Sequence, residues 1–168
     1  MSSLLVMGGA RSGKSRYAQA RAEASGLRPF FIATAQAFDE EMHHRIARHR
    51  ADRGGQWATI EAPLALSDAI AAHDAPGHVL LVDCLTLWVS NLMLAERDIA
   101  AALDELTTSI ARTEAMLILV GNEVGCGIVP DNALARRFRD EAGLVNQRIA
   151  ACVDEVQLLC AGLNLRFK

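Results

Sequence analysis

The sequence predicts an α/β fold in which a mostly parallel sheet is covered by helices on both faces. Short apolar runs recur along the 168-residue chain, and segments rich in helix formers separate them. This alternation favours parallel strands joined by helical crossovers. The runs are apolar throughout rather than at every second residue, which is typical of strands buried on both faces. A glycine-rich loop joins the first run to the first helical segment and is the first functional signal in the chain.

The glycine-rich loop covers residues 8–15 and follows the phosphate-binding pattern G-x-x-x-x-G-K-[ST]. It consists of Gly8, Gly9, Ala10, Arg11, Ser12, Gly13, Lys14 and Ser15. The apolar residues 4–7 before it predict a strand, and residues 16–24 after it predict a helix. The alternative is a plain glycine-rich turn without a ligand, but the pattern occurs here between the strand and the helix that it requires. The loop therefore indicates a P-loop nucleotide-binding protein.

Each residue type in this loop contributes to phosphate binding in a different way. Glycine lets the backbone curl tightly, so that its N–H groups can approach phosphate oxygens. The start of the following helix adds N–H donors and a partial positive charge. We expect the Lys14 ammonium to reach the β- and γ-phosphates, and the Ser15 hydroxyl to bind Mg²⁺.

Two strands, a charged segment between them and a helix are predicted over residues 29–72. Residues 29–32 predict a second buried strand. The charged segment 39–53 begins acidic and turns basic, the order that suits a helix dipole, and two glycines end it. Residues 57–61 predict a short strand, and a modest helix begins at Pro63 and ends at residue 72.

The second half of the chain continues the same alternation. Further strands are predicted over residues 79–82, 116–120 and 156–160, with residues 163–167 pairing at the sheet edge. Helices are predicted over residues 85–94, 99–110 and 134–149, the last two with apolar residues every three or four positions. Because no repeat, low-complexity tract or linker interrupts this pattern, residues 1–168 are expected to form one nucleotide-binding catalytic domain.

Polar residues follow several of the predicted strands directly. Right-handed crossovers place the loops after parallel strands at one edge of the sheet, so Thr34, Asp83, Asn122 and Glu123 should meet the glycine loop around a nucleotide. P-loop proteins place an acid at the position of Asp83 to hold Mg²⁺, directly or through water. The alternative is that Asp83 caps the next helix. The loop after Asn122 contains glycines, which favours a backbone close to a ligand, although a plain connecting loop would look similar.

Residues 43–53 are dense in histidine and arginine. If this segment is helical, Arg45, His49 and Arg53 are four residues apart and share one face. An imidazole between two guanidiniums is pushed toward its neutral, nucleophilic form, and the guanidiniums can grip a polyphosphate. Spacing alone nevertheless favours the commoner explanation, a charged helix that faces solvent.

Composition excludes several classes of protein. A formal net charge of −3 and only 5% aromatic residues argue against a nucleic-acid partner. No apolar run approaches the roughly 18 residues of a membrane span, and no secretory signal is recognised, so we expect a cytoplasmic location. The cysteines lie far apart without metal-ligand spacing and are expected to be scattered buried thiols in a reducing cytoplasm: Cys84, Cys126, Cys152 and Cys160.

In order and spacing, these motifs resemble the bifunctional adenosylcobinamide kinase / adenosylcobinamide-phosphate guanylyltransferase family of cobalamin biosynthesis. The resemblance covers nearly the whole chain. It is most specific in the basic segment around His49 and in the stretch from Asn122 to Pro130. It is also carried by the glycine loop and by Ile32, Ala33, Thr34, Ala35, Arg45, Ile46, Trp57, Glu61, residues 81–88, Phe138, Arg139, Asp140, Asn146 and Gln147. One departure is Gly121, where family members often carry serine or threonine.

The resemblance implies a RecA-like P-loop NTPase fold and two reactions. In the first, ATP or GTP phosphorylates the hydroxyl of the aminopropanol arm of adenosylcobinamide. In the second, GTP donates GMP to that phosphate, giving adenosylcobinamide-GDP and pyrophosphate through a covalent GMP–histidine. The matching histidine is His49, because it follows Arg45 and Ile46 by the family spacing.

The resemblance also implies a nucleotide site and an assembly. Lys14 and His49 would be catalytic, and Mg²⁺ would be held by Ser15 and Asp83. Either Glu61 or Asp83 would instead read the guanine N–H edge, which competes with the magnesium role of Asp83. The implied assembly is a homotrimer. The implied guanine-nucleotide contacts are residues 8–15, Ala33, Thr34, Ala35, Arg50, Ala51, Asp52, Arg53, Glu61 and Asp83.

Two other functions are compatible with the glycine loop. A small-molecule kinase limited to phosphoryl transfer would need Lys14, Ser15 and Asp83 and would leave His49 dispensable. A non-catalytic nucleotide-sensing module would bind a nucleotide and act through a partner. The net charge and the scarcity of aromatic residues count against DNA as that partner.

Overall fold

A computed structural model describes residues 2–36 and 54–168. The predictions for the charged segment 39–53, including His49, Arg50, Ala51, Asp52 and Arg53, therefore lie outside the described residues. The strands are β1 (Ser3–Gly8), β2 (Arg28–Ala33), β3 (Ala58–Glu61), β4 (His78–Asp83), β5 (Met116–Asn122), β6 (Glu155–Cys160) and β7 (Leu163–Arg166). Over the described ranges they form a single sheet in the order β3-β2-β4-β5-β1-β6-β7. All neighbours are parallel except β6 and β7, which pair as an antiparallel hairpin at one edge.

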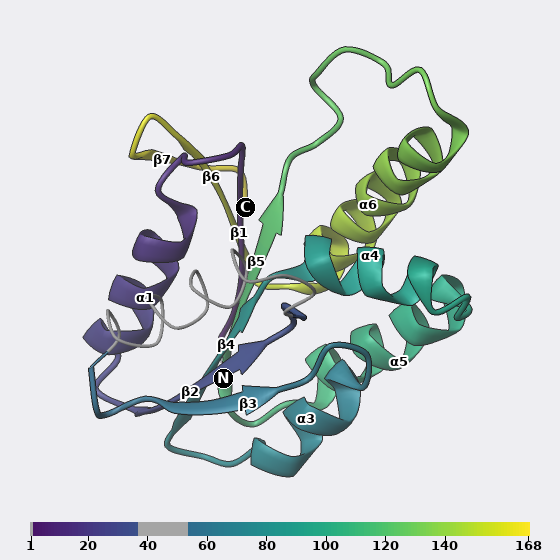
Figure 1. Cartoon of the computed structure of the whole chain (residues 1–168). Helices are drawn as coiled ribbons and strands as arrows, with labels where there is room; N and C mark the ends of the chain where they lie inside the picture. Colours follow the sequence, from purple (N-terminus) through teal and green to yellow (C-terminus); the bar gives the residue numbers. More distant parts are fainter. Residues whose placement is uncertain (1, 37–53) are drawn as a thin grey trace.

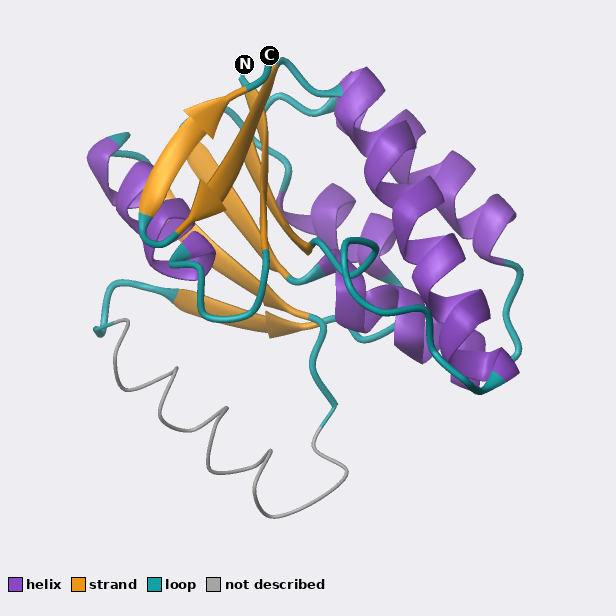
Figure 2. Cartoon of the chain, turned by 90° about the horizontal axis from the view of Figure 1, so that it is seen from above, coloured by secondary structure: helices purple, strands orange, loops and turns teal. Residues whose placement is uncertain are grey.

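Helices cover both faces of this sheet, as predicted. They are α1 (Lys14–Ala24), α3 (Leu66–His73), α4 (Leu85–Leu94), α5 (Ile99–Arg112) and α6 (Ala133–Cys152). In Figures 1 and 2, α1 lies on one face, and α3, α4, α5 and α6 lie together on the other. Within the described ranges, none of these helices is long and apolar enough to cross a membrane.

The residues of β1 show why the strands are apolar throughout. Leu4 and Val6 pack into the cluster of buried residues beside α1, while Leu5 packs into the larger cluster beside the other helices. All three side chains are at most 1% exposed. Because successive side chains of a strand point to opposite faces, a sheet covered on both sides needs apolar residues at every position.

Several element boundaries differ from the sequence-based predictions by one to three residues, and two of these differences lie near the carboxyl ends of the strands. The helix expected from Pro63 begins only at Leu66, because the carbonyls of Pro63 and Leu64 accept hydrogen bonds from side chains of α4 at 3.0 and 2.9 Å. Strand β5 continues two residues beyond its expected end, through Gly121 to Asn122. Both differences come from contacts between residues that are distant in the sequence.

An ion pair joins α1 to the start of β6. The Arg21 guanidinium donates two hydrogen bonds of 2.9 Å to the Glu155 carboxylate, one to each oxygen. This contact holds the pKa of Glu155 at about 2, well below its ordinary value of 4.5. Glu155 lies opposite Leu4 on β1, far along the strands from the glycine loop.

Replacing Glu155 with Gln should destabilise the fold by about 1 kcal/mol near neutral pH. A carboxyl with a depressed pKa stabilises the folded state above its unfolded pKa, and this contribution is lost as the pH falls through the folded value. The wild type and the variant should therefore converge as the pH falls from 4.5 toward about 2. Urea unfolding at a series of pH values measures this, with the exposed Glu114→Gln as control. A difference that is independent of pH would contradict the role of the ion pair.

Candidate nucleotide site at the carboxyl edge of the sheet

The register of the parallel strands brings three of the predicted site residues into one row across the sheet. Glu61 on β3 pairs with Ala33 on β2, and Ala33 pairs with Asp83 on β4. Asp83 in turn pairs with Val120 on β5, which pairs with Val6 on β1. Since neighbouring strands are about 4.8 Å apart, Asp83 lies roughly 10 Å from β1 and Glu61 roughly 19 Å from it. The row therefore runs outward from the strand that carries the glycine loop.

The glycine loop begins two residues beyond Val6, the residue of β1 that lies in this row. Gly8 ends β1 and lies opposite Asn122 on β5. A Cβ atom on Gly8 would lie 2.5 Å from the Ser12 hydroxyl oxygen and 2.6 Å from the Leu159 carbonyl oxygen, so a side chain does not fit there. Gly13 has a φ of 95°, a conformation that other residues rarely adopt, and it is the N-cap of α1. The close packing and the positive φ explain why these two positions are glycines.

The loop is arranged to receive phosphate groups. No side chain caps the N-terminus of α1, and the first turn of that helix contains no acidic residue. The first peptide N–H groups and the positive end of the helix dipole thus remain for an anion. Lys14 folds back across the loop, and its ammonium donates a hydrogen bond of 3.1 Å to the Gly9 carbonyl oxygen. Such a position allows the ammonium to reach phosphates bound over the loop.

A turn between β6 and β7 supports the loop from behind. The Gly162 N–H donates a hydrogen bond of 2.9 Å to the Ser12 carbonyl oxygen. Figure 1 shows this turn beside the start of α1, at the same edge of the sheet as the loop after β5. Ser12 is buried, and its hydroxyl has no hydrogen-bond partner in the part of the chain that the structure describes.

Thr34 makes several hydrogen bonds within the fold that the sequence did not indicate. The Thr34 side chain is fully buried. Its hydroxyl donates a hydrogen bond of 2.7 Å to the Cys84 carbonyl and accepts one of 2.8 Å from the Cys84 N–H. The Thr34 carbonyl accepts from the Asn91 amide at 2.7 Å. Thr34 therefore fixes the backbone that follows Asp83. Nucleotide contacts of Thr34 and of its half-buried neighbours Ala33 and Ala35 stay a prediction.

Asp83 is half-buried at the end of β4 and is not the cap of the next helix. The N-cap of α4 is Cys84, whose sulfur accepts a hydrogen bond of 3.5 Å from the Leu87 N–H. Burial raises the pKa of the Cys84 thiol to about 11, which favours its protonated form near neutral pH. The capping alternative for Asp83 is thus taken by its neighbour. Asp83 and the Ser15 hydroxyl offer hard oxygen ligands of the kind that Mg²⁺ prefers.

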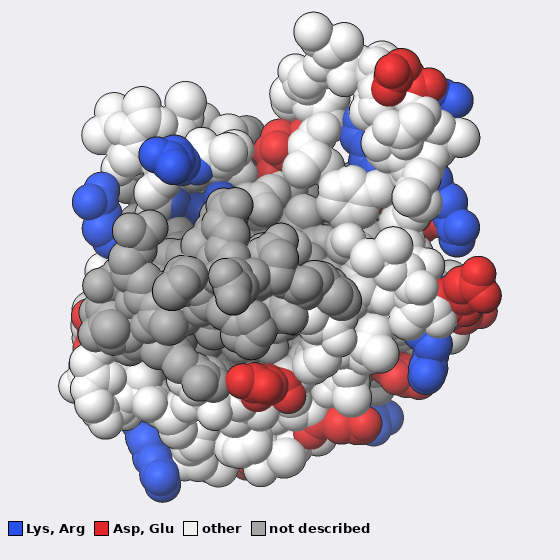
Figure 3. All heavy atoms as spheres, in the orientation of Figure 1, with Lys and Arg blue, Asp and Glu red and all other residues white. Residues whose placement is uncertain are grey.

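Over residues 2–36 and 54–168, no group of three or more His, Cys, Asp or Glu side chains could hold a metal ion alone. All four cysteines are free, but Cys84 alone among them is buried. The prediction of buried thiols is wrong for Cys126, Cys152 and Cys160, which lie in a loop and at the ends of α6 and β6 and are exposed. Lys and Arg side chains are interspersed with Asp and Glu on the described part of the face in Figure 3, which fits the small net charge.

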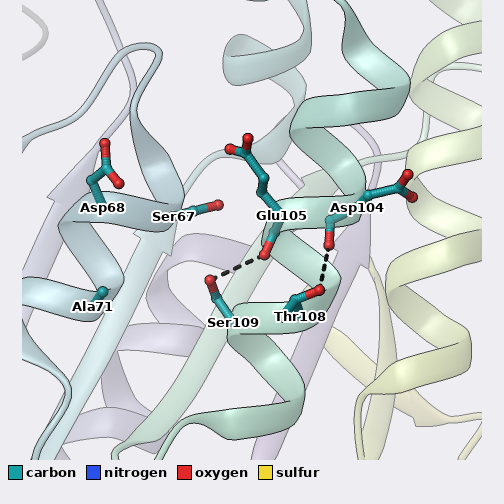
Figure 4. Close-up of a pocket in the computed structure, with 7 residues that line it drawn as sticks. All are labelled: Ser67, Asp68, Ala71, Asp104, Glu105, Thr108 and Ser109. Carbon is teal, nitrogen blue, oxygen red and sulfur yellow. Dashed lines mark hydrogen bonds between the residues drawn. The ribbon is translucent and has the colours of Figure 1, made fainter.

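Two hollows lie outside the row of strand ends. One, of about 440 Å³, is lined by Ser67, Asp68, Ala71, Asp104, Glu105, Thr108 and Ser109 from α3 and α5 (Figure 4). Its acidic side chains would repel phosphates, and the hydroxyls of Thr108 and Ser109 bond to carbonyls of their own helix. The other, of about 500 Å³, lies where the loop after β5 meets α6 and is lined by Gly125, Arg139, Asp140, Gly143, Leu144 and Gln147.

Three buried polar residues near the row have no role that the sequence indicated. Asn91, Thr86 and Asn146 are 5%, 7% and 8% exposed. They occur at apolar positions of α4 and α6, and a lone polar residue on a buried helix face is the signal that could have found them. Thr86 and Asn146 both bond to the backbone of Asn122, at the end of β5.

Comparisons with known proteins identify the family of this chain. A family model described as cobinamide kinase / cobinamide phosphate guanyltransferase matches residues 4–167. The chain is 46% identical to the bifunctional adenosylcobalamin biosynthesis protein CobP of Pseudomonas aeruginosa, over 98% of this chain and 96% of that one. It is 42% identical to the bifunctional adenosylcobalamin biosynthesis protein CobU of Salmonella typhimurium, over 98% and 99% of the two chains.

Similarity to solved structures concerns the fold alone. The flagellar accessory protein FlaH of Methanocaldococcus jannaschii matches with a TM-score of 0.54 at 12% identity, over 99% of this chain and 78% of that one. The P4 protein of bacteriophage phi6, solved in complex with ADP, matches with a TM-score of 0.51 at 15% identity, over 97% and 52%. These matches confirm the RecA-like P-loop NTPase fold. By its sequence, its glycine loop and its near full-length relatives, the chain belongs to the cobinamide kinase / cobinamide phosphate guanyltransferase family, whose name states both of its enzyme activities.

Proposed function

We propose that the chain carries out both transfers at a single nucleotide site, at the carboxyl edge of the sheet. Adenosylcobinamide is first phosphorylated by ATP or GTP. GMP from GTP is then transferred to the new phosphate through a covalent GMP–His49 intermediate. The observation that carries this proposal is the strand register, which puts Glu61, Ala33 and Asp83 in one row beside the glycine loop.

In the kinase step, the loop N–H groups and Lys14 hold the phosphates of the nucleotide. The oxygen of the substrate hydroxyl attacks the γ-phosphorus, the bond from that phosphorus to the β–γ bridging oxygen breaks, and the hydroxyl proton is released. Ser15 and Asp83 would hold Mg²⁺, which supplies positive charge for the phosphate oxygens when it is bound. The position of Lys14 over the loop supports this assignment.

In the guanylyl transfer, the neutral imidazole of His49 attacks the α-phosphorus of GTP, and the bond to the β-phosphate breaks to release pyrophosphate. A phosphate oxygen of the substrate then attacks the same phosphorus, and the P–N bond breaks. Arg50 and Arg53 would neutralise phosphate charge during both displacements. Two facts support His49: the match to the family motif, and the exit of the chain from β2 at Ala33, on the same edge as the glycine loop.

The register supports different roles for Asp83 and Glu61. Asp83 is two strands from β1, within reach of an ion at the terminal phosphates, whereas Glu61 is four strands away. In an extended nucleotide the base lies farther from the triphosphate end than the metal does. We therefore assign Asp83 to magnesium and Glu61 to the N–H edge of guanine.

We also propose that the enzyme acts in the cytoplasm as a homotrimer, as the family resemblance implies. Exposed apolar side chains support an assembly. Leu163 on β7 is 76% exposed and Ile128 in the loop after β5 is 97% exposed, so a second copy has apolar surface to cover. β7 also ends the sheet with an unpaired edge in the described part of the chain.

Replacing His49 with Ala should abolish covalent guanylylation and leave phosphoryl transfer at least partly active, since only the second reaction needs the imidazole. Incubation with GTP labelled at the α-phosphate should leave an acid-labile, base-stable label on the wild type and none on the variant. His43→Ala, six residues before the family motif position in the sequence, is the control and should keep the label. Label retained in His49→Ala would assign the nucleophile elsewhere.

Replacing Glu61 with Gln should weaken guanine recognition, because the amide presents an N–H donor to the guanine N–H groups. We expect KM for GTP to rise on the order of tenfold or more, while the kinase step with ATP changes little. Asp83→Asn should instead impair both nucleotides, with a loss that extra Mg²⁺ partly restores. Steady-state kinetics with each nucleotide separates the two roles, and the reverse pattern would exchange them.

A further inference from the structure

The last residue of β5 is held by side chains from two different helices. The Asn122 N–H donates a hydrogen bond of 2.7 Å to the Thr86 hydroxyl on α4. The Asn122 carbonyl accepts a hydrogen bond of 3.2 Å from the Asn146 amide on α6. Both side chains are more than nine-tenths buried, so this end of β5 is fixed from inside the fold rather than from its surface.

Asn146 fits in this place because Gly121 has no side chain. A Cβ atom on Gly121 would lie only 2.9 Å from the Asn146 amide oxygen. Since this is closer than real Cβ contacts, any larger residue at position 121 would force the Asn146 side chain to move. The glycine at position 121, which the sequence marks as a departure from the family pattern, is thus matched to the asparagine on α6.

The fixed residue lies at the centre of the proposed site. β5 runs between β1, which carries the glycine loop, and β4, which carries Asp83. Asn122 pairs with Gly8, and the next N–H, that of Glu123, donates to the Gly8 carbonyl at 3.1 Å. Because Val120 pairs with Asp83, Asn122 extends two residues, about 6.6 Å, beyond the level of that acid.

The carboxamide of Asn122 remains for a ligand, while nearby polar side chains are occupied. The Glu123 carboxylate accepts hydrogen bonds from the Gly125 and Cys126 N–H groups of its own loop. The Asn91 amide donates to the carbonyls of Thr34 and Pro63. In the described part of the chain, no hydrogen-bond partner is found for the half-buried side chain of Asn122.

We propose that Asn122 is a further catalytic residue that donates a hydrogen bond to the terminal phosphate oxygens, and that Thr86 and Asn146 are the positioning residues that hold it there. An uncharged donor at this point stabilises the charge that moves onto the β–γ oxygens in the kinase step and onto pyrophosphate in the guanylyl transfer. The inference rests on the proposed function, because it needs a triphosphate over the glycine loop.

The catalytic role is tested with Asn122→Asp and Asn122→Ala in the full-length enzyme. We expect kcat of the kinase step with ATP to fall on the order of tenfold to a hundredfold in the alanine variant. The loss should be larger in the aspartate variant, which has the same shape but repels phosphate, while thermal stability stays close to wild type. An aspartate variant with wild-type kcat would overturn the catalytic role. If the wild-type enzyme catalyses neither phosphoryl transfer nor guanylyl transfer, the proposed function is wrong as well.

The positioning role is tested with Thr86→Val, Thr86→Ser and Gly121→Ala. Thr86→Val and Gly121→Ala should lower kcat about tenfold with little change in KM for ATP, and Thr86→Ser, which keeps the hydroxyl, should restore it. Thr113→Val is the matched control, because the Thr113 hydroxyl donates to Asp74 at 2.6 Å near the start of β5, away from the site. If Thr86→Val and Thr113→Val lose similar stability and both keep wild-type kcat, Thr86 is only structural and the positioning role is wrong.

Discussion

The structure depends on the burial of the sheet on both of its faces. Leu4, Leu5 and Val6 on β1 are almost completely inaccessible, and the central parts of β4 and β5 are buried in the same way. A polar group in the middle of such a strand would be costly unless it were paired. Chemistry is therefore confined to the strand ends, and the parallel pairing decides which ends meet. The row from Glu61 through Asp83 to β1 follows directly from that pairing.

Polar side chains near this edge mostly support the backbone. Thr34 and Asn91 fix the turn after β4, while Thr86 and Asn146 fix the end of β5. A buried polar side chain that makes its hydrogen bonds specifies one arrangement of the chain and penalises others. The site is thus a set of strand ends whose positions are set by helices on the opposite face from α1. This support is what a transfer reaction requires, since small displacements of the reacting groups reduce the rate strongly.

Much of the fold and part of the site could be predicted from the sequence, because the signals for them are local. The glycine loop, the strand before it and the helix after it are encoded within the first residues of the chain, and Asp83 is placed by the strand that it ends. Contacts across long sequence separations could not be predicted. The Thr34 hydroxyl bonds across 50 residues to the backbone of Cys84, and the Asn91 amide bonds across 57 residues to the Thr34 carbonyl.

Two further features that the sequence did not predict also depend on contacts between different elements. The match between Gly121 and Asn146 joins a strand to a helix that follows it, and neither periodicity nor motif spacing reveals such a pair. The start of α3 at Leu66 is set by bonds from α4, which lies later in the chain. Sequence patterns specify elements and their order, whereas the details of the site depend on how those elements pack.

The claim that one nucleotide site serves both reactions is tested most directly with Lys14→Ala, assayed for both steps in the same preparation. A shared site requires that the rate of phosphoryl transfer and the rate of covalent guanylylation by GTP fall together, because both depend on the ammonium over the glycine loop. A variant that loses phosphoryl transfer but is guanylylated at the wild-type rate would show two separate nucleotide sites and contradict the claim.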